Sequence, residues 1–287
     1  MQAASRLAGP RGRRTAGAQR SVRTRATVRD AEKGTGQCVW RRAFVDVNEP
    51  GSADGSVRVL LVSVDDEWEA LDMRRDAFKR ESSRWADGFE IPGQFVGIAV
   101  KEETPGGDDS CPADVVLPVA SSPTTVREAS SQLSVAKLEL VVSEDGPGAE
   151  LCKLGRGERL LVTQPLGEGF APLQTLTENA GLLNALEEGR DLIIIGCGYV
   201  GYGALRSAAG WAPVQAAAAA GPRRVQAVQF FPSKDKGACV PEWSAWRDDG
   251  MGVHVFFGEE EEAKIVEALE RTVLANPEPD QPLPSLE

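Results

Sequence analysis

The sequence contains one histidine, His254, among 287 residues. A metal site with several histidine ligands is therefore excluded, and a Ser-His-Asp triad would depend on that single residue. The five cysteines never occur as Cys-x-x-Cys, which argues against a zinc finger and against a disulfide scaffold. No run of 18 apolar residues occurs, so a conventional membrane-spanning helix is excluded as well. We expect no metal site and no membrane span.

Positive charge is scarce outside the beginning of the chain. Residues 1–26 contain seven arginines and no aspartate or glutamate. The rest of the chain holds 25 basic and 43 acidic residues, a net charge of −18. The chain after residue 26 is acidic enough to repel nucleic acid and anionic membranes, whereas a basic protein partner stays possible.

The segment 1–26 has the composition of an organelle transit peptide. It is rich in arginine, alanine, serine, threonine and glycine, and it lacks the apolar stretch of a secretory signal. Its style is closer to chloroplast than to mitochondrial import, so we expect a chloroplast protein in the stroma or associated with thylakoids. The alternative interpretation is a disordered basic arm that binds nucleic acid.

Short alternating apolar and polar runs fill residues 27–176. Glycine, proline and aspartate separate the runs, which is the pattern of antiparallel strands. The expected strands lie at 38–48, 57–64, 95–100, 115–120, 135–143 and 157–164, with a short helical segment at 149–154. Six or seven short strands in about 130 residues predict a barrel or a sandwich.

The pattern changes near residue 187, after an expected hinge at 176–190. Strands now alternate with helical segments, which predicts a parallel sheet in a smaller α/β domain over 187–275. The expected strands are 191–195, 225–231 and 253–257, and the expected helices are 203–220, 242–248 and 259–274. Residues 276–287 hold four prolines and are expected to be a disordered tail.

Several short motifs follow one another in a characteristic order. They are Pro-Gly-Gln-Phe-Val at 92–96, Ala-Ser-Ser-Pro at 120–123, Gly-Arg-Gly-Glu at 155–158 and Pro-Leu-Gly-Glu-Gly-Phe at 165–170, with a strand, glycine-rich turn and helix at 192–207. In this order the chain resembles the ferredoxin–NADP reductase superfamily over most of residues 38–260. The plant and algal "fruit protein" type of ferredoxin reductase-like proteins is the most similar branch.

This resemblance implies a fold, two cofactors and their binding residues. The implied fold is an antiparallel flavin-binding β-barrel followed by a parallel α/β nucleotide-binding domain, truncated here to three strands of about five. The implied cofactors are FAD and NAD(P)H. The implied contacts are Ala120, Ser121 and Ser122 with the flavin ring, Gly148 and Ala149 with the flavin phosphates, Gly196, Gly198 and Gly201 with the pyridine nucleotide, and Ser233 and Lys234 with a 2′-phosphate. No catalytic acid or base is identified.

The chain departs from the family pattern at the flavin-binding strand. Val115 and Leu117 stand where the family has an arginine for the pyrophosphate and an aromatic residue for the isoalloxazine. Valine cannot replace the charge-assisted hydrogen bonds of an arginine. At the second phosphate site Ala149 replaces the usual serine or threonine.

Two functions therefore stay open. The first is a flavin-dependent oxidoreductase that passes electrons between NAD(P)H and an unknown acceptor in the chloroplast. The second is a catalytically degenerate reductase-like subunit with a structural or regulatory role, bound to a chloroplast complex or an electron-transfer protein. A classical Rossmann dehydrogenase is less favoured, because the glycine motif follows a β-rich region and the next strand ends without an acidic residue.

Overall fold

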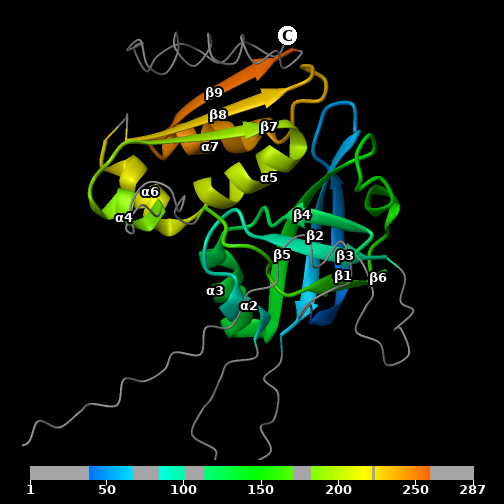
Figure 1. Ribbon diagram of the computed structural model, residues 1–287. Coiled ribbons are helices and arrows are strands. Elements are labelled where there is room, and N and C mark those ends of the chain that lie inside the picture. The colour runs from blue at the N-terminus through cyan, green and yellow to red at the C-terminus, as the bar shows by residue number, and fades with distance from the viewer. Residues whose placement is uncertain (1–38, 67–83, 101–112, 171–181, 222–223, 259–287) are drawn as a thin grey trace, which may run out of the picture.

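The computed structural model describes residues 39–66, 84–100, 113–170, 182–221 and 224–258. The expected transit peptide, the expected helix at 259–274 and the expected tail lie outside these ranges. The described residues form a six-stranded antiparallel sheet and a three-stranded parallel sheet with helices (Figure 1). The predicted fold class, a barrel followed by a smaller α/β unit, is confirmed. Within these ranges no helix is long and apolar enough to cross a membrane.

Alternating apolar residues build the barrel. Its strands are β1 (Trp40–Pro50), β2 (Val57–Asp65), β3 (Phe95–Ala99), β4 (Val115–Pro118), β5 (Val135–Ser143) and β6 (Arg159–Thr163), in the sheet order β4-β3-β6-β1-β2-β5. Beyond the end of β4, the amide of Ala120 donates to the carbonyl of Glu139 on β5 at 2.8 Å. That bond draws the two outer strands together, so the barrel is nearly closed.

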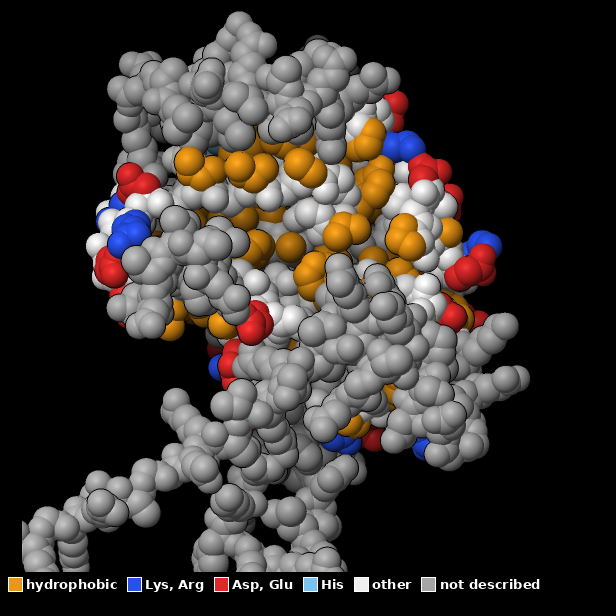
Figure 2. All heavy atoms as spheres, viewed as in Figure 1, with side chains coloured by type: hydrophobic (Ala, Val, Ile, Leu, Met, Phe, Trp, Pro, Cys, Tyr) orange, Lys and Arg blue, Asp and Glu red, His pale blue; other side chains and the backbone are white. Residues whose placement is uncertain are grey.

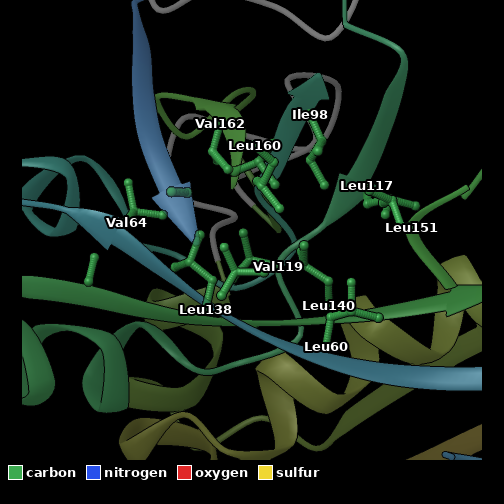
Figure 3. Packing of buried hydrophobic residues seen from close by; sticks show 14 of the residues in the cluster. Leu60, Val64, Ile98, Leu117, Val119, Leu138, Leu140, Leu151, Leu160 and Val162 are labelled. Atoms are coloured by element: carbon green, nitrogen blue, oxygen red, sulfur yellow. The ribbon is translucent and has the colours of Figure 1, made fainter. Parts of the chain in front are cut away.

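The barrel interior is filled by one face of each strand. Figure 3 shows Ile98, Leu138, Leu140, Leu160 and Val162 converging on the centre, and all five are buried. Burying a leucine, isoleucine or valine side chain stabilises the fold by about 1.5–3 kcal/mol. This core accounts for the alternation that predicted the strands.

Three helical segments accompany the barrel: α2 (Trp85–Gly88), α3 (Pro123–Leu133) and the 3₁₀ helix η1 (Leu151–Lys153). Helix α3 was not predicted, because the Ser-Pro at its start was interpreted only as the end of a strand. Ser122 is its N-cap, with the side-chain oxygen accepting from the amide of Thr125 at 3.2 Å. Proline at the first helical position is compatible with such a start, since its missing N–H has no helical partner anyway.

The second unit contains α4 (Leu182–Glu187), β7 (Leu192–Cys197), α5 (Gly198–Ala209), α6 (Ala212–Ala219), β8 (Val225–Phe231), α7 (Val240–Asp248) and β9 (Gly252–Phe257). Its three strands are parallel in the order β7-β8-β9. The expected helix at 203–220 is two helices, and the first begins earlier, at Gly198. The glycine-rich stretch is therefore the first turn of α5 and not a long loop. Helix α4 occupies part of the expected hinge.

The units meet at α5 and at the segment before α7. Helix α5 packs on β4 and β5, and a Cβ added to Gly203 would lie 3.1 Å from Cγ of Pro118. On the other side, Ser52 forms a β-bridge with Ala238, and the amide of Cys239 donates to the carbonyl of Gly51 at 2.7 Å. The barrel thus holds the second unit through α5 and through the segment that precedes α7.

Candidate functional site

Gln94 connects the two motifs that carried most of the resemblance. Its side chain is fully buried. Its Oε1 accepts from the amides of Glu90 and Ile91, at 2.9 Å and 3.2 Å. Its Nε2 donates to the carbonyl of Gly167 at 3.2 Å. One amide side chain therefore fixes the turn before β3 to the segment after β6.

Glycines complete this connection. Gly169 has a φ of +62°, and a Cβ there would lie 2.4 Å from the carbonyl oxygen of Pro92. A Cβ on Gly93 would lie 3.1 Å from the ring of Phe170, whose amide donates to the carbonyl of Pro92 at 2.9 Å. The motifs at 92–96 and 165–170 thus need glycine and glutamine for packing, so they support the fold without identifying a ligand.

The two departing positions on β4 face the barrel interior. Val115 pairs with Ile98 and Leu117 pairs with Val96, and all four belong to the barrel core. Val115 is 6% and Leu117 3% exposed, and Figure 3 shows Leu117 among the converging side chains. Valine and leucine at these positions fill a core, which explains why neither residue is charged or polar.

The segment Ala120–Ser122 is buried under α5. Each of its residues is at most 4% exposed. Ser121 uses its Oγ to accept from the amide of Glu139 at 3.1 Å, and its carbonyl accepts from Oγ of Ser207 at 2.8 Å. Because Ser122 caps α3, both hydroxyl groups already have protein partners. The side chains of these residues offer a flavin ring neither an unpartnered hydroxyl nor free surface.

The turn that contains Gly148 and Ala149 is held by a backbone hydrogen bond and by close packing. A Cβ on Gly148 would lie 3.2 Å from Val142, and the amide of Ala149 donates to the carbonyl of Gly146 at 3.1 Å. The following helix η1 has only three residues, so it provides no extended row of free amides. With the positions on β4 and at 120–122 filled as well, FAD does not fit the residues as the structure arranges them.

The three glycines of the second unit have different roles. A Cβ on Gly196 would lie 2.2 Å from Oε1 of Gln229 and 2.9 Å from the carbonyl oxygen of Gly201, so this pair permits close packing of β7 against α5. Gly198 has a φ of +61°, and an added Cβ would meet nothing within 4 Å. Gly198 alone of the three lies at an uncrowded helix start, where a dipole favours anions.

The loop after β8 approaches this helix start. Parallel strands place Ser233 and Lys234 at the same end of the sheet as Gly198, with Ser233 partly buried and Lys234 exposed. Lys236 in the same loop reaches the barrel, where its Nζ is paired with the carboxylate of Asp145. Burial raises the pKa of Tyr199, which also senses the charges of Lys236 and Asp145. Sequence reasoning missed Lys236, and no local motif marks it.

A charged cluster that the sequence did not predict lies between the units. Arg206 on α5 forms ion pairs with Glu139 of β5 at 2.9 Å and with Glu242 of α7 at 2.7 Å. Tyr202 donates from its hydroxyl to Glu242 at 3.0 Å, and burial raises the pKa of this tyrosine well above its ordinary value. Burial alone would lower the pKa of Arg206, but the bonds to Glu242 and Glu139 offset that effect and raise it.

No group of three or more histidine, cysteine, aspartate or glutamate side chains within the described ranges is placed to hold a metal ion. Within the charged cluster, the pair of Arg206 with Glu139 crosses the junction of the two units, whereas the bonds of Arg206 and Tyr202 to Glu242 lie inside the second unit.

No model of a known protein family matches the chain, and no curated protein matches its sequence. Several solved structures, in contrast, are similar to the chain. Ferredoxin–NADP reductase from Neisseria gonorrhoeae, with bound FAD and NADP, is 11% identical with a TM-score of 0.50, over 85% of this chain and 81% of that one. The cytochrome P450 reductase GcoB from Amycolatopsis is 17% identical with a TM-score of 0.47, over 81% of this chain and 59% of that one.

Ferredoxin–NADP reductase from Plasmodium falciparum is similar at 10% identity, with a TM-score of 0.46, over 82% of this chain and 77% of that one. The chain spans only about three fifths of the Amycolatopsis reductase. At these identities the likeness concerns the fold alone, which recurs among proteins of different function. The chain therefore has the two-part fold of the ferredoxin–NADP reductases, a fold of flavin-dependent oxidoreductases, as the resemblance implied.

Proposed function

We propose that this chain is a reductase-fold subunit that acts by binding protein and does not turn over a flavin. The observation that carries the proposal is the contact between α5 and the segment 120–122, where Oγ of Ser207 donates to the carbonyl of Ser121 at 2.8 Å. Function resides in sites and not in folds, and this place is occupied by the protein itself.

The other two places that the resemblance assigns to FAD support the same conclusion. Val115 and Leu117 belong to the barrel core, and Gly148 packs against Val142. A buried serine pair and two core aliphatic residues would have to be exposed before a flavin could enter. Exposing each core side chain costs about 1.5–3 kcal/mol, which a loosely held cofactor does not supply.

The proposed setting is a chloroplast complex or an electron-transfer protein. The support for a chloroplast location is the basic segment 1–26, which has the composition of a transit peptide. The support for a protein partner is the acidic body of net charge −18, which attracts a basic surface over distances of about one Debye length.

A second candidate function is a flavin-dependent NAD(P)H oxidoreductase. The specific observation in its favour is Gly198, which starts the twelve-residue helix α5 with no neighbour within 4 Å of an added Cβ. A helix start of this kind suits a phosphate group. In this candidate function α5 would have to separate from the segment 120–122 to admit the flavin ring.

The visible absorption spectrum distinguishes the two functions. The chain is refolded with excess FAD, desalted and examined beside an untreated sample whose circular dichroism establishes that it is folded. We expect a colourless, folded protein. A retained flavin spectrum that bleaches with NADPH would overturn the proposal and favour the oxidoreductase.

A further inference from the structure

The smaller sheet ends at β7. Strand β8 pairs with β7 on one side and β9 on the other, and among the described residues no strand pairs with the second edge of β7. An unpaired edge presents a row of backbone donors and acceptors to any chain that can pair with it.

The backbone groups at this edge can be assigned. The amide of Leu192 donates to the carbonyl of Arg224, at 2.8 Å, on the β8 side. Because successive residues of a strand point to opposite edges, Ile193 and Ile195 direct their N–H and C=O groups to the other edge. Two isoleucines thus offer four hydrogen-bonding groups outward.

The side chains of these isoleucines form an apolar strip. Ile193 is 41% and Ile195 48% exposed, and Val200 at the start of α5 is 44% exposed. Figure 2 shows a row of apolar side chains along β7, and no Lys, Arg, Asp or Glu side chain interrupts the visible part of this row. Residues 192–205 contain no charged side chain.

Natural edge strands are usually protected from pairing by a lysine, a proline or a bulge. Strand β7 (Leu192–Cys197) has none of these within its length. No strand among the described residues pairs with the outward backbone groups of Ile193 and Ile195, and both side chains are exposed, which is the chemistry of a pairing surface.

We propose that this edge pairs antiparallel with β7 of a second copy of the chain, about a two-fold axis that passes beside Ile194. In that register Ile193 faces Ile195 of the second copy, and Ile195 faces its Ile193. Since both residues point outward, each facing pair exchanges two N–H···O=C bonds, and the four isoleucines lie on the same face. The two sheets join into one sheet of six strands with an isologous interface.

The charges next to the strand do not oppose pairing with a second copy. The register places Asp191 opposite Cys197 and Arg190 opposite Gly198, so no like charges face each other. A shift by one residue would set outward-facing groups against groups that already bond to β8. Long-range repulsion between two acidic bodies opposes association, and salt screens that repulsion. The dimer therefore strengthens as salt increases.

Sedimentation velocity of the full chain tests the pairing. We expect a concentration-dependent dimer at 0.15 M salt, on the order of physiological ionic strength, and a monomer for Ile195→Lys. The matched control is Leu133→Lys, because Leu133 is 56% exposed on α3, on the barrel; this variant stays dimeric. A monomeric natural chain, or a dimer that survives Ile195→Lys, would overturn the proposal.

A cysteine cross-link tests the register without relying on the lysine variant. Paired residues that exchange hydrogen bonds have Cα atoms about 5.5 Å apart, within the reach of a disulfide. Asp191→Cys should therefore give a covalent dimer through Cys197 of the second copy on oxidation with diamide, whereas Asp191→Cys combined with Cys197→Ser should not. A natural dimer that Asp191→Cys leaves uncross-linked would contradict the register. Neither result depends on whether the chain binds flavin.

Discussion

Arg206 on α5 donates to both carboxylate oxygens of Glu242 on α7. Its Nε lies 2.7 Å from Oε2 and its Nη2 lies 2.8 Å from Oε1. Its third nitrogen, Nη1, lies 2.9 Å from Glu139 on the barrel strand β5. A planar guanidinium is suited to such a three-way contact, because its donors are fixed in one fork. One side chain thereby connects the barrel with α5 and α7 of the second unit.

The first prediction concerns this cluster. Glu242→Gln keeps the shape of the side chain but removes the charge that Arg206 binds, so we expect a loss of about 2 kcal/mol in the free energy of unfolding. Urea unfolding measures the loss. The matched control is Glu150→Gln, because the pair of Glu150 with Lys153 is exposed and such pairs contribute at most about 1 kcal/mol. Equal losses in the two variants would show that the cluster does not stabilise the junction.

The second prediction concerns β4, the strand that the resemblance aligns with a flavin-binding strand. Val115→Arg restores the family residue, but the side chain at this position points into the barrel core. We expect a loss of at least about 3 kcal/mol, because an unpaired charge would be buried, and no gain in FAD binding. Thermal unfolding and the quenching of FAD fluorescence measure the two effects. Val116→Arg, at the partly buried next position, is the control and is expected to be tolerated. A stable Val115→Arg that binds FAD would contradict the structural assignment.

The third prediction separates the two kinds of glycine at the start of α5. Gly196→Ala places a Cβ 2.2 Å from Gln229 and 2.9 Å from Gly201, so β7 and α5 must move apart at a cost of about 3 kcal/mol. Gly198→Asn has room for its Cβ, and asparagine accepts a positive φ, so the expected cost is below about 1 kcal/mol. Urea unfolding measures both variants. The reverse order of costs would indicate that the 196–201 glycines are not packing residues.

Much of the fold follows from sequence because its cause is local. Alternation of apolar residues predicted the barrel strands, a continuous apolar run predicted β7, and the alternation of strands with helical segments predicted β8 and β9. Helix α3 was missed although Ser122 and Pro123 form a recognisable helix start. These residues directly follow a strand, so they were interpreted as the end of that strand and not as the start of a helix.

The candidate site was less predictable because it depends on contacts between distant segments. Ser121 and Ser207 are 86 positions apart, and Arg206 and Glu242 are 36 apart. No local sequence pattern indicates that α5 covers the segment 120–122 or that Lys236 pairs with Asp145. The direction of Val115 likewise depends on its pairing with β3, which single-sequence reasoning about a motif does not supply.

The fourth prediction concerns His254, the sole histidine of the chain. Its Nε2 lies 2.8 Å from Oε1 of Gln226 on the neighbouring strand. Burial, followed by the charge of Arg247, lowers the pKa of His254 below its ordinary value of 6.5. The folded protein therefore binds the proton more weakly than the unfolded chain does. The stability that His254 contributes is complete above about pH 6.5 and declines as the pH falls toward the lowered pKa.

One proton limits the size of this decline to about 1.4 kcal/mol per pH unit. Urea unfolding of the natural chain and of His254→Gln, each at pH 7.5 and 5.5, isolates the effect, because the carboxylates of both proteins titrate alike. We expect the natural chain to lose more stability over this interval than the variant. Identical losses would mean that the histidine is protonated equally well in the folded and unfolded states, and that β9 does not bury its ring.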